Sequence, residues 1–325
     1  MTTSPRSISA TALSRYIHLD RCGRFLRFML DPQTATALGT RYGVGKEPLS
    51  PVLADYGQDF EARVVATLPE PKHDLTNQPE QATLAALRAV APGGQIFLVQ
   101  ARLTGDINGW PCLGDADIIQ VTRRADGAFD LAVMDVKTSV RDHMEYRLQV
   151  AFYIRLLRGM LAEAGLALAG VTGAILKQGA DGALPAWDDP AARFDVAPYD
   201  LVLDHLFDPV EGDLAQVAGR DLADIPYALN AKCDECSFNR LCLRESADRQ
   251  DIALVPGIQP TDIPALKAAG VRTLRDLVDL KTLPDPPVKH APLPPAPGQD
   301  AILTAISRQP ALAARLDPLV LRARA

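Results

Sequence analysis

The stretches Gly114-Asp115-Ala116-Asp117 and Met134-Asp135-Val136-Lys137, separated by a short hairpin, are the most informative part of this chain. Both lie in runs of apolar and β-branched residues, which predict two strands of an antiparallel hairpin. If the strands pair in register, Asp117 and Asp135 lie on one face. Lys137 shares the face of Asp135, because residues two apart in a strand point the same way.

The segments around this hairpin alternate between helical and strand-like periodicity. Apolar residues at three- and four-residue steps predict helices, and short β-branched runs bounded by turn residues predict strands. We expect helices over 9–29, 55–68, 80–90, 145–166 and 198–219, and strands over 95–103, 112–123, 129–137 and 171–177. This order predicts an α/β fold with a three-stranded antiparallel meander at its centre.

Two carboxylates beside a lysine suit phosphodiester hydrolysis. Carboxylate oxygens bind Mg²⁺ or Mn²⁺, and such a metal polarises a phosphate and acidifies a bound water. Glu61 borders the apolar stripe of its helix and is expected to complete the metal site. Gln149 and Tyr153, four apart on a helix, share one face beside Lys137. Each pattern alone is weak, since a surface ion pair explains Asp-X-Lys, but their order favours the functional interpretation.

A second group of candidate metal ligands consists of cysteines. Cys233, Cys236 and Cys242 lie close together in the sequence, and Cys22 is the expected fourth ligand. Iron–sulfur clusters and structural zinc sites both accept four thiolates, so the spacing leaves both open. Cys112 lies in a predicted strand and is expected to be a small buried residue.

The region after Arg249 differs in composition from the rest of the chain. Residues 255–280 predict helix, tight turn, helix, the pattern of a helix-hairpin-helix that offers backbone amides to a phosphate. A simple packing hairpin is the alternative. Residues 284–297 hold seven prolines and predict a linker. Residues 300–325 predict one or two short helices with little to pack against.

Size and charge limit the classes of protein that fit. The 325 residues, 47% of them hydrophobic, allow one large domain or two smaller ones. A net charge of −6 argues against non-specific coating of nucleic acid but leaves room for a nuclease. No membrane span, secretory signal or ATPase motif is expected, and a cytoplasmic location follows. There, five cysteines are ligands or core residues rather than disulfides.

Together these motifs resemble the PD-(D/E)XK nuclease superfamily, in its RecB-like branch. The chain is most similar to the iron–sulfur nucleases there: CRISPR-associated RecB-like exonucleases, the nuclease domain of AddB, and RecB-like nucleases with a helix-hairpin-helix. Their pattern is an acidic residue or histidine on an early helix, Gly-X2-Asp, Asp/Glu-X-Lys and Gln-X3-Tyr. The matching residues, within about 9–280, are Gly57 and Glu61, Gly114 and Asp117, Asp135 and Lys137, and Gln149 and Tyr153. Asp115 is an alternative, but the register of Gly-X2-Asp favours Asp117.

The resemblance implies a restriction-endonuclease-like central mixed sheet flanked by helices, an iron–sulfur clamp and a small C-terminal helical module. The implied catalytic residues are Asp117, Asp135, Lys137, Glu61, Gln149 and Tyr153. The implied ligands of Mg²⁺ or Mn²⁺ are Glu61, Asp117, Asp135 and Val136, and those of a four-iron, four-sulfur cluster are Cys22, Cys233, Cys236 and Cys242. The expected domains are a nuclease domain with its cluster over 1–249, a helix-hairpin-helix over 250–283, and a linker with a helical tail over 284–325.

The function implied by the resemblance is that of a metal-dependent DNA nuclease acting on single strands, ends or flaps. Its setting would be DNA repair, CRISPR adaptation or antiviral defence, with DNA and a protein of a repair or defence complex as partners. Two alternatives remain: a non-catalytic, metal-stabilised module that binds nucleic acid or protein, and a zinc-bearing RNA-processing factor. The complete acidic and lysine set argues against the first.

Overall fold

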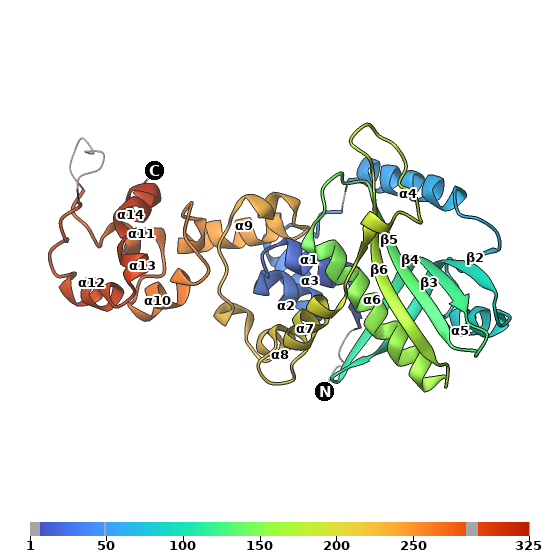
Figure 1. Ribbon diagram of the computed structural model, residues 1–325. Helices are drawn as coiled ribbons and strands as arrows, with labels where there is room; N and C mark the ends of the chain where they lie inside the picture. The colour runs from blue at the N-terminus through green and yellow to red at the C-terminus, as the bar shows by residue number, and fades with distance from the viewer. Residues whose placement is uncertain (1–6, 49, 284–291, 325) are drawn as a thin grey trace. The chain divides into compact units, whose positions relative to one another are not determined.

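The computed structural model describes residues 7–48, 50–283 and 292–324, which form two compact units (Figure 1). Unit 1 consists of the described residues within Met1–Arg21 and Leu49–Gly219, and unit 2 of those within Cys22–Pro48 and Arg220–Ala325. The expected domain boundary at residue 249 lies inside unit 2. Within the described ranges, no helix is long and apolar enough to cross a membrane.

Unit 1 is built on a mixed sheet with the strand order β2-β3-β4-β5-β6-β7, in which β1 also pairs with β4. The strands are β1 (Ile8–Ser9), β2 (Lys72–Asp74), β3 (Gln95–Ile107), β4 (Trp110–Arg123), β5 (Phe129–Lys137), β6 (Leu168–Lys177) and β7 (Arg193–Phe194). The pairs β3–β4 and β4–β5 are antiparallel, which confirms the predicted meander. Because β6 pairs with β5 in parallel, the sheet is mixed and the α/β class is confirmed.

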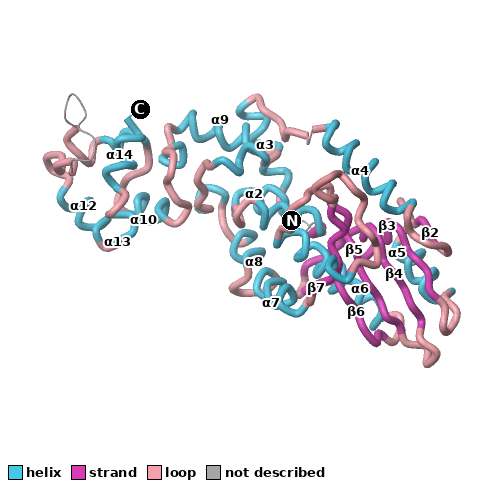
Figure 2. The backbone as a smooth tube through the Cα atoms, turned by 45° about the horizontal axis from the view of Figure 1, so that its top comes forward, coloured by secondary structure: helices cyan, strands magenta, loops and turns pink. Residues whose placement is uncertain are grey.

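Helices cover both faces of this sheet (Figure 2). The helices of unit 1 are α1 (Ala10–His18), α4 (Pro51–Ala66), α5 (Glu80–Ala89), α6 (Met144–Glu163), α7 (Ala197–Leu206) and α8 (Asp213–Ala218), with the short η1 (Pro190–Ala192). Phe60 and Val64 of α4 pack in one cluster with Val136, whereas the neighbouring Asp135 contacts Gln149 of α6. Successive strand residues face opposite sides, so α4 and α6 lie on opposite faces.

The helix predicted over residues 9–29 is interrupted. Helix α1 ends at His18, and α2 (Gly23–Leu30) begins after Cys22. Between them Asp20 and Arg21 have φ angles of 53° and 56°. Two consecutive left-handed residues cannot continue a right-handed helix, so the prediction of one helix was wrong. The boundary between the two units falls at this break.

The helix predicted over residues 198–219 is also divided, into α7 and α8. After α7 the Asp208 carboxylate accepts the backbone N–H groups of Val210 and Glu211, at 2.9 and 2.7 Å. An aspartate that bonds the amides following it forms a turn in competition with the helix. That local competition ends α7.

Unit 2 is helical. Its elements are α2, α3 (Pro32–Tyr42), η2 (Leu222–Asp224), η3 (Ala231–Glu235), α9 (Asn239–Arg249), η4 (Ile252–Leu254), α10 (Asp262–Ala268), α11 (Leu274–Val278), α12 (Asp300–Ser307), α13 (Pro310–Ala313) and α14 (Leu316–Arg324). Helices α10 and α11 form the predicted helix, turn, helix, with Gly270 at a φ of 91° between them. Much of the expected proline-rich linker, residues 284–291, lies outside the described residues.

The tail of the chain is better packed than expected. Three helices are present instead of one or two, and they share a core with the hairpin that includes Leu266, Leu277, Leu316 and Leu319. The Arg322 guanidinium also donates to the Pro256 carbonyl at 2.8 Å. The expectation that the tail has little to pack against was therefore wrong, because its leucines meet those of α10 and α11.

Candidate functional site

Strand β4 loses its regular pairing at Asp117. The pairing of β4 with β5 ends at Ile118 and Met134, and one residue further the Asp117 carboxylate accepts the Val136 N–H at 2.8 Å. On the other side, the pairing of β3 with β4 is interrupted at Gln100, which lies opposite Asp117. The sheet is thus locally opened on both sides of this aspartate.

Gln100 causes the interruption on the β3 side. Its φ is 51°, a left-handed conformation that costs a non-glycine residue about 1–2 kcal/mol. Its side-chain amide donates to Glu61 Oε1 of α4 and, at 3.4 Å, to Asp117 Oδ1. Backbone strain of this kind persists only where the surroundings hold it, and here Gln100 joins Glu61 to Asp117.

The pleat of both strands changes phase at this break. Val99 and Ile118 belong to the cluster with α4, whereas Gly105 and Gly114 lie against α6. Positions an even number apart in a regular strand share a face, so each strand has shifted by one residue between them. A Cβ atom on Gly114 would approach the Tyr153 ring to 2.5 Å. The glycine of Gly-X2-Asp therefore makes room for the tyrosine of Gln-X3-Tyr.

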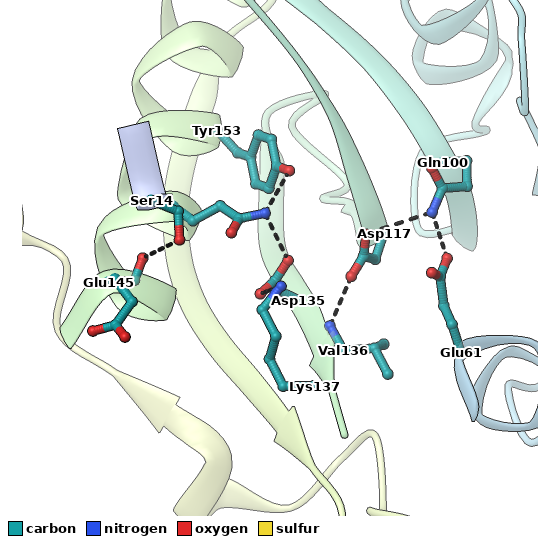
Figure 3. A network of polar contacts seen from close by, with 10 residues as sticks. Ser14, Glu61, Gln100, Asp117, Asp135, Val136, Lys137, Glu145 and Tyr153 are labelled. Carbon is teal, nitrogen blue, oxygen red and sulfur yellow. Dashed lines mark hydrogen bonds and ion pairs between the residues drawn. The ribbon is translucent and has the colours of Figure 1, made fainter. Parts of the chain in front are cut away.

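A second polar network lies at the end of β5 beside α6 (Figure 3). Asp135 is fully buried, and its Oδ2 lies 2.6 Å from Lys137 Nζ. The Gln149 amide donates to Asp135 Oδ1 at 3.2 Å and to the Tyr153 hydroxyl at 2.9 Å. The Lys137 ammonium also lies over the Tyr146 ring, 5.4 Å from its centroid. The two sequence patterns, Asp-X-Lys and Gln-X3-Tyr, thus meet in one network.

The acidic groups of these two networks act on one another. Burial, the Asp135 carboxylate and the Glu61 carboxylate raise the pKa of Asp117 well above its ordinary value. Burial and Asp135 also raise the pKa of Glu61, against the hydrogen bond from Gln100. Burial disfavours the charged form of Lys137, but Asp135 and Asp117 outweigh it and raise the lysine pKa. The three carboxylates and the Lys137 ammonium therefore lie close enough to interact electrostatically.

The donor set fits a hard divalent cation. It supplies carboxylate oxygens, which hard cations prefer as ligands. With all three carboxylates ionised and Lys137 protonated, the site has a net charge of −2. Across the described parts of the chain, no three His, Cys, Asp or Glu side chains already surround one point as metal ligands do. The carboxylate oxygens face N–H donors and the Lys137 ammonium, contacts that a cation would exchange for its own. Val136 contributes an N–H, and its side chain packs with α4, so only its carbonyl oxygen can serve as a ligand.

Two residues near this site have roles that the sequence did not reveal. Gln100 was missed, and its signal in the sequence is an amide directly after the apolar run Ile96–Val99. Tyr146, under the Lys137 ammonium, was also missed. Asp115, the alternative to Asp117, binds Arg102 Nε at 2.5 Å and takes no part in the hydrogen bonds of Asp117 described above.

The four cysteines of the predicted cluster all belong to unit 2. Cys22 precedes α2, Cys233 and Cys236 lie in and after η3, and Cys242 lies in α9. Burial raises the pKa of the Cys22 thiol, and the nearby Cys233 adds to it. Burial raises the pKa of Cys242 to about 12, with contributions from Cys22 and Cys236. Cys22 thus acts electrostatically on Cys233 and Cys242, and Cys236 acts on Cys242, although in the described residues no three of these thiols surround one point as metal ligands do.

Hydrogen-bond donors face these sulfurs. The backbone N–H groups of Arg24 and Phe25 point at Cys22, and those of Asn230 and Phe238 lie 3.5 Å from the sulfurs of Cys233 and Cys236, respectively. Such donors stabilise metal-bound thiolates and are typical around iron–sulfur and zinc sites. The surroundings fit either group. Cys112, in unit 1, is buried as predicted.

A buried ion pair adjoins the cysteines and was not foreseen. Arg24 is 1% exposed, pairs with the equally buried Glu245, and lies 4.4 Å from the centroid of the Tyr227 ring. Its charge and a hydrogen bond lower the pKa of Cys242, against the effect of burial. Arg249 pairs with the other Glu245 oxygen at 2.7 Å. The Arg24 guanidinium is thus held next to the Cys242 thiol.

No family model matches the chain, and no curated protein matches it. Nine chains of solved structures match. One is the crystal structure of SSO0001, which is 13% identical, with a TM-score of 0.31, over 74% of this chain and 88% of that chain. A similarity at this TM-score carries no argument about fold or function.

Replacement of Asp117 by asparagine is expected to stabilise the metal-free protein. Because folding raises the pKa of Asp117, the folded protein binds more protons than the unfolded chain between the ordinary and the raised value. The free energy of unfolding therefore falls as pH rises through that window. Asp117→Asn removes this loss, so in EDTA its advantage over the wild type is largest at about pH 7 and shrinks towards about pH 4. Urea denaturation measures both proteins.

The matched control is Asp115→Asn, on the same strand. Asp115 is partly exposed and paired with Arg102, so its replacement should bring no such gain at neutral pH. A wild-type protein that is more stable than Asp117→Asn in EDTA at neutral pH contradicts the electrostatic description of the site.

Loss of Glu245 is expected to destabilise unit 2. Glu245→Ala leaves the Arg24 guanidinium buried without its carboxylate, which typically costs about 3–5 kcal/mol. Asp248→Ala, at an exposed position of the same helix, should cost less than about 1 kcal/mol. Urea denaturation followed by circular dichroism measures the difference, and equal stability of the two variants would show that the buried pair does not support the unit.

Proposed function

We propose that this protein is a metal-dependent DNA nuclease whose unit 1 has a restriction-endonuclease-like fold of the RecB-like PD-(D/E)XK type. One observation carries the proposal: hydrogen bonds and an ion pair join Asp135, Lys137, Gln149 and Tyr153 in one network. Asp117 interacts electrostatically with Asp135 and Lys137 of this network. A structural ion pair at a strand end needs neither a buried glutamine and tyrosine nor a further buried carboxylate. Buried carboxylates that raise one another's pKa are, by contrast, typical of functional sites, and a bound cation would relieve their repulsion.

The roles of the side chains follow from their contacts. A divalent cation held by Glu61, Asp117 and Asp135 would polarise the phosphate and acidify a water. Lys137 keeps its proton, because its pKa is raised, and its ammonium offsets negative charge that develops on the phosphate. Gln149 orients Asp135 by bonding Oδ1, which leaves Oδ2 towards Lys137.

Two further groups support this arrangement. Burial raises the pKa of Tyr153 well above its ordinary value, so its hydroxyl stays neutral and accepts the Gln149 amide. Lys177 of β6 stands in register with Lys137, and register partners in a parallel pair point to the same face. Its positive charge would attract a nucleic-acid backbone to this edge of the sheet.

In unit 2, Cys22, Cys233, Cys236 and Cys242 would hold a four-iron, four-sulfur cluster in preference to zinc. The donors around the sulfurs and the buried Arg24 support a site whose ligands are anionic. The cluster would act as a clamp on the fold and not as the catalyst. The hairpin of α10 and α11 would contact DNA phosphates without reading sequence.

The substrate in this proposal is DNA with single strands, ends or flaps. The resemblance to RecB-like nucleases supports a place in DNA repair, CRISPR adaptation or another antiviral defence, in the cytoplasm and together with a protein partner. This assignment of a setting rests on analogy between families.

The nuclease proposal predicts that Lys137→Ala stops metal-dependent cleavage. The wild type is expected to degrade end-labelled single-stranded DNA with Mn²⁺, and the variant to lose at least about a hundredfold in rate, as when a charge-stabilising group is removed. Lys72→Ala, on the edge strand β2, serves as the matched control and should cleave at the wild-type rate. Circular dichroism shows that each variant is folded. Undiminished cleavage by folded Lys137→Ala refutes the assigned site.

The cluster proposal predicts coloured protein. Anaerobically purified wild type should be brown and contain iron, since iron–sulfur clusters absorb visible light. Cys242→Ser should lose iron, whereas Cys112→Ser, at a buried thiol of unit 1, should keep it. Iron and zinc analysis of both variants measures the outcome, and colourless wild type with stoichiometric zinc decides for zinc.

A further inference from the structure

Arg24 is a buried cation that links two segments holding candidate cluster ligands. It lies two residues after Cys22, in the first turn of α2, and its side chain is 1% exposed. Its partner Glu245 lies three residues after Cys242, so the two side chains share one side of α9. A single ion pair thus connects the segment of one predicted ligand to the helix that carries another.

This position is unfavourable for a cation in itself. The start of a helix carries a partial positive charge, which disfavours an arginine in the first turn of α2. Burial of an ion pair also removes both charges from water, and apolar residues of similar volume often give equal or greater stability. Packing of unit 2 does not by itself require a charge here, and this indicates another role for Arg24.

The Arg24 guanidinium has donors beyond its ion pair. The side chain donates a hydrogen bond to the Cys242 sulfur, and its charge also acts on Cys22. Tyr227 and Phe28 have their ring centroids 4.4 and 5.3 Å from the guanidinium carbon. Nε is buried and, among the described residues, has no hydrogen-bond partner, which is rare for a donor in a folded protein. An unused donor on a residue that bonds a candidate ligand fits a further acceptor such as a cluster sulfide.

We propose that Arg24 raises the reduction potential of the four-iron, four-sulfur cluster, which makes the cluster a one-electron redox centre as well as a clamp. This inference rests on the proposed cluster and adds to its role. Reduction transfers one electron from an external one-electron donor to the cluster, so its negative charge grows by one while no bond breaks and no proton moves. A fixed cation and an N–H donor at a ligand sulfur stabilise the more negative, reduced form more than the oxidised form.

Glu245 does not cancel the charge of Arg24. Its two oxygens are divided between Arg24 and Arg249, so two guanidinium groups face one carboxylate. The Arg249 side chain is 43% exposed, and water and salt screen its charge. Arg24 is shielded from solvent by its burial, and an arginine in a protein keeps its proton. The charge beside the Cys242 sulfur is therefore fixed and only weakly screened.

The test is a redox titration of the anaerobically purified full-length protein with dithionite, followed by visible absorbance and by electron paramagnetic resonance of the reduced cluster. At a given potential, Arg24→Gln is expected to shift the ratio of reduced to oxidised cluster about tenfold towards the oxidised form, which for one electron corresponds to about 59 mV. Glu245→Gln removes the opposing charge and should shift the ratio towards the reduced form. Arg24→Lys keeps the cation and should stay closer to the wild type than Arg24→Gln does. A purely structural role of the pair predicts no such opposite shifts.

Arg249→Gln is the matched control, since it removes the exposed cation on the same carboxylate. Its ratio should change by less than about twofold, because solvent screens that charge. Iron analysis and circular dichroism show which variants are folded and loaded. Equal potentials of wild type, Arg24→Gln and Glu245→Gln overturn the inference, as do equal shifts in Arg24→Lys and Arg24→Gln, or a wild-type cluster that dithionite does not reduce. If Arg24→Gln holds no iron, Glu245→Gln decides: a raised potential supports the inference, whereas an unchanged potential or loss of iron overturns it.

The inference and the proposals before it fail separately. An iron-containing cluster whose potential does not depend on Arg24 removes the redox role and keeps the clamp. Colourless wild type with stoichiometric zinc removes the cluster, and the redox role with it. Neither result bears on DNA cleavage, which the Lys137→Ala assay tests by itself.

Discussion

The left-handed backbone of Gln100 in the middle of a long strand is the constraint on which the candidate site depends. A regular strand at this position would pair continuously with β4, and the side chain opposite would be one more member of an apolar ladder. Because Gln100 reverses the pleat, β4 shifts phase with it and Asp117 lies at the opening. The same glutamine then bonds Glu61 and Asp117, so one strained residue both opens the sheet and joins two acidic groups.

Each unit contains a set of acidic groups that repel one another when they are ionised. In unit 1, Asp117, Asp135 and Glu61 raise one another's proton affinity within a largely buried site. In unit 2, the cysteine thiols do the same around Arg24. Each set is surrounded by N–H donors or a cation that relieve part of the repulsion. Such clusters are unfavourable for stability alone, and this is why they mark sites of function.

Much of the fold was accessible from local patterns. The meander and the helix after it follow from apolar periodicity and turn residues, and the positions of Asp135 and Lys137 follow from the two-residue period of a strand. The breaks in the helices were not accessible. Asp20 and Arg21 adopt left-handed conformations that their residue types do not require, and Asp208 is one aspartate among many until its carboxylate meets the next amides.

Residue types and short spacings alone predict the central meander with the helix after it, the α/β class, and which side chains have the chemistry of metal ligands. They did not predict α3, β2 or β7, or the breaks in two helices. Only the tertiary structure decided which side chains meet. Gln100 reaches Glu61 across 39 positions, Tyr56 reaches Gln178 across 122, and Arg24 meets Glu245 from another helix. Contacts of this kind depend on how strands shift and helices pack, and those energies arise from the whole chain, which no local pattern contains.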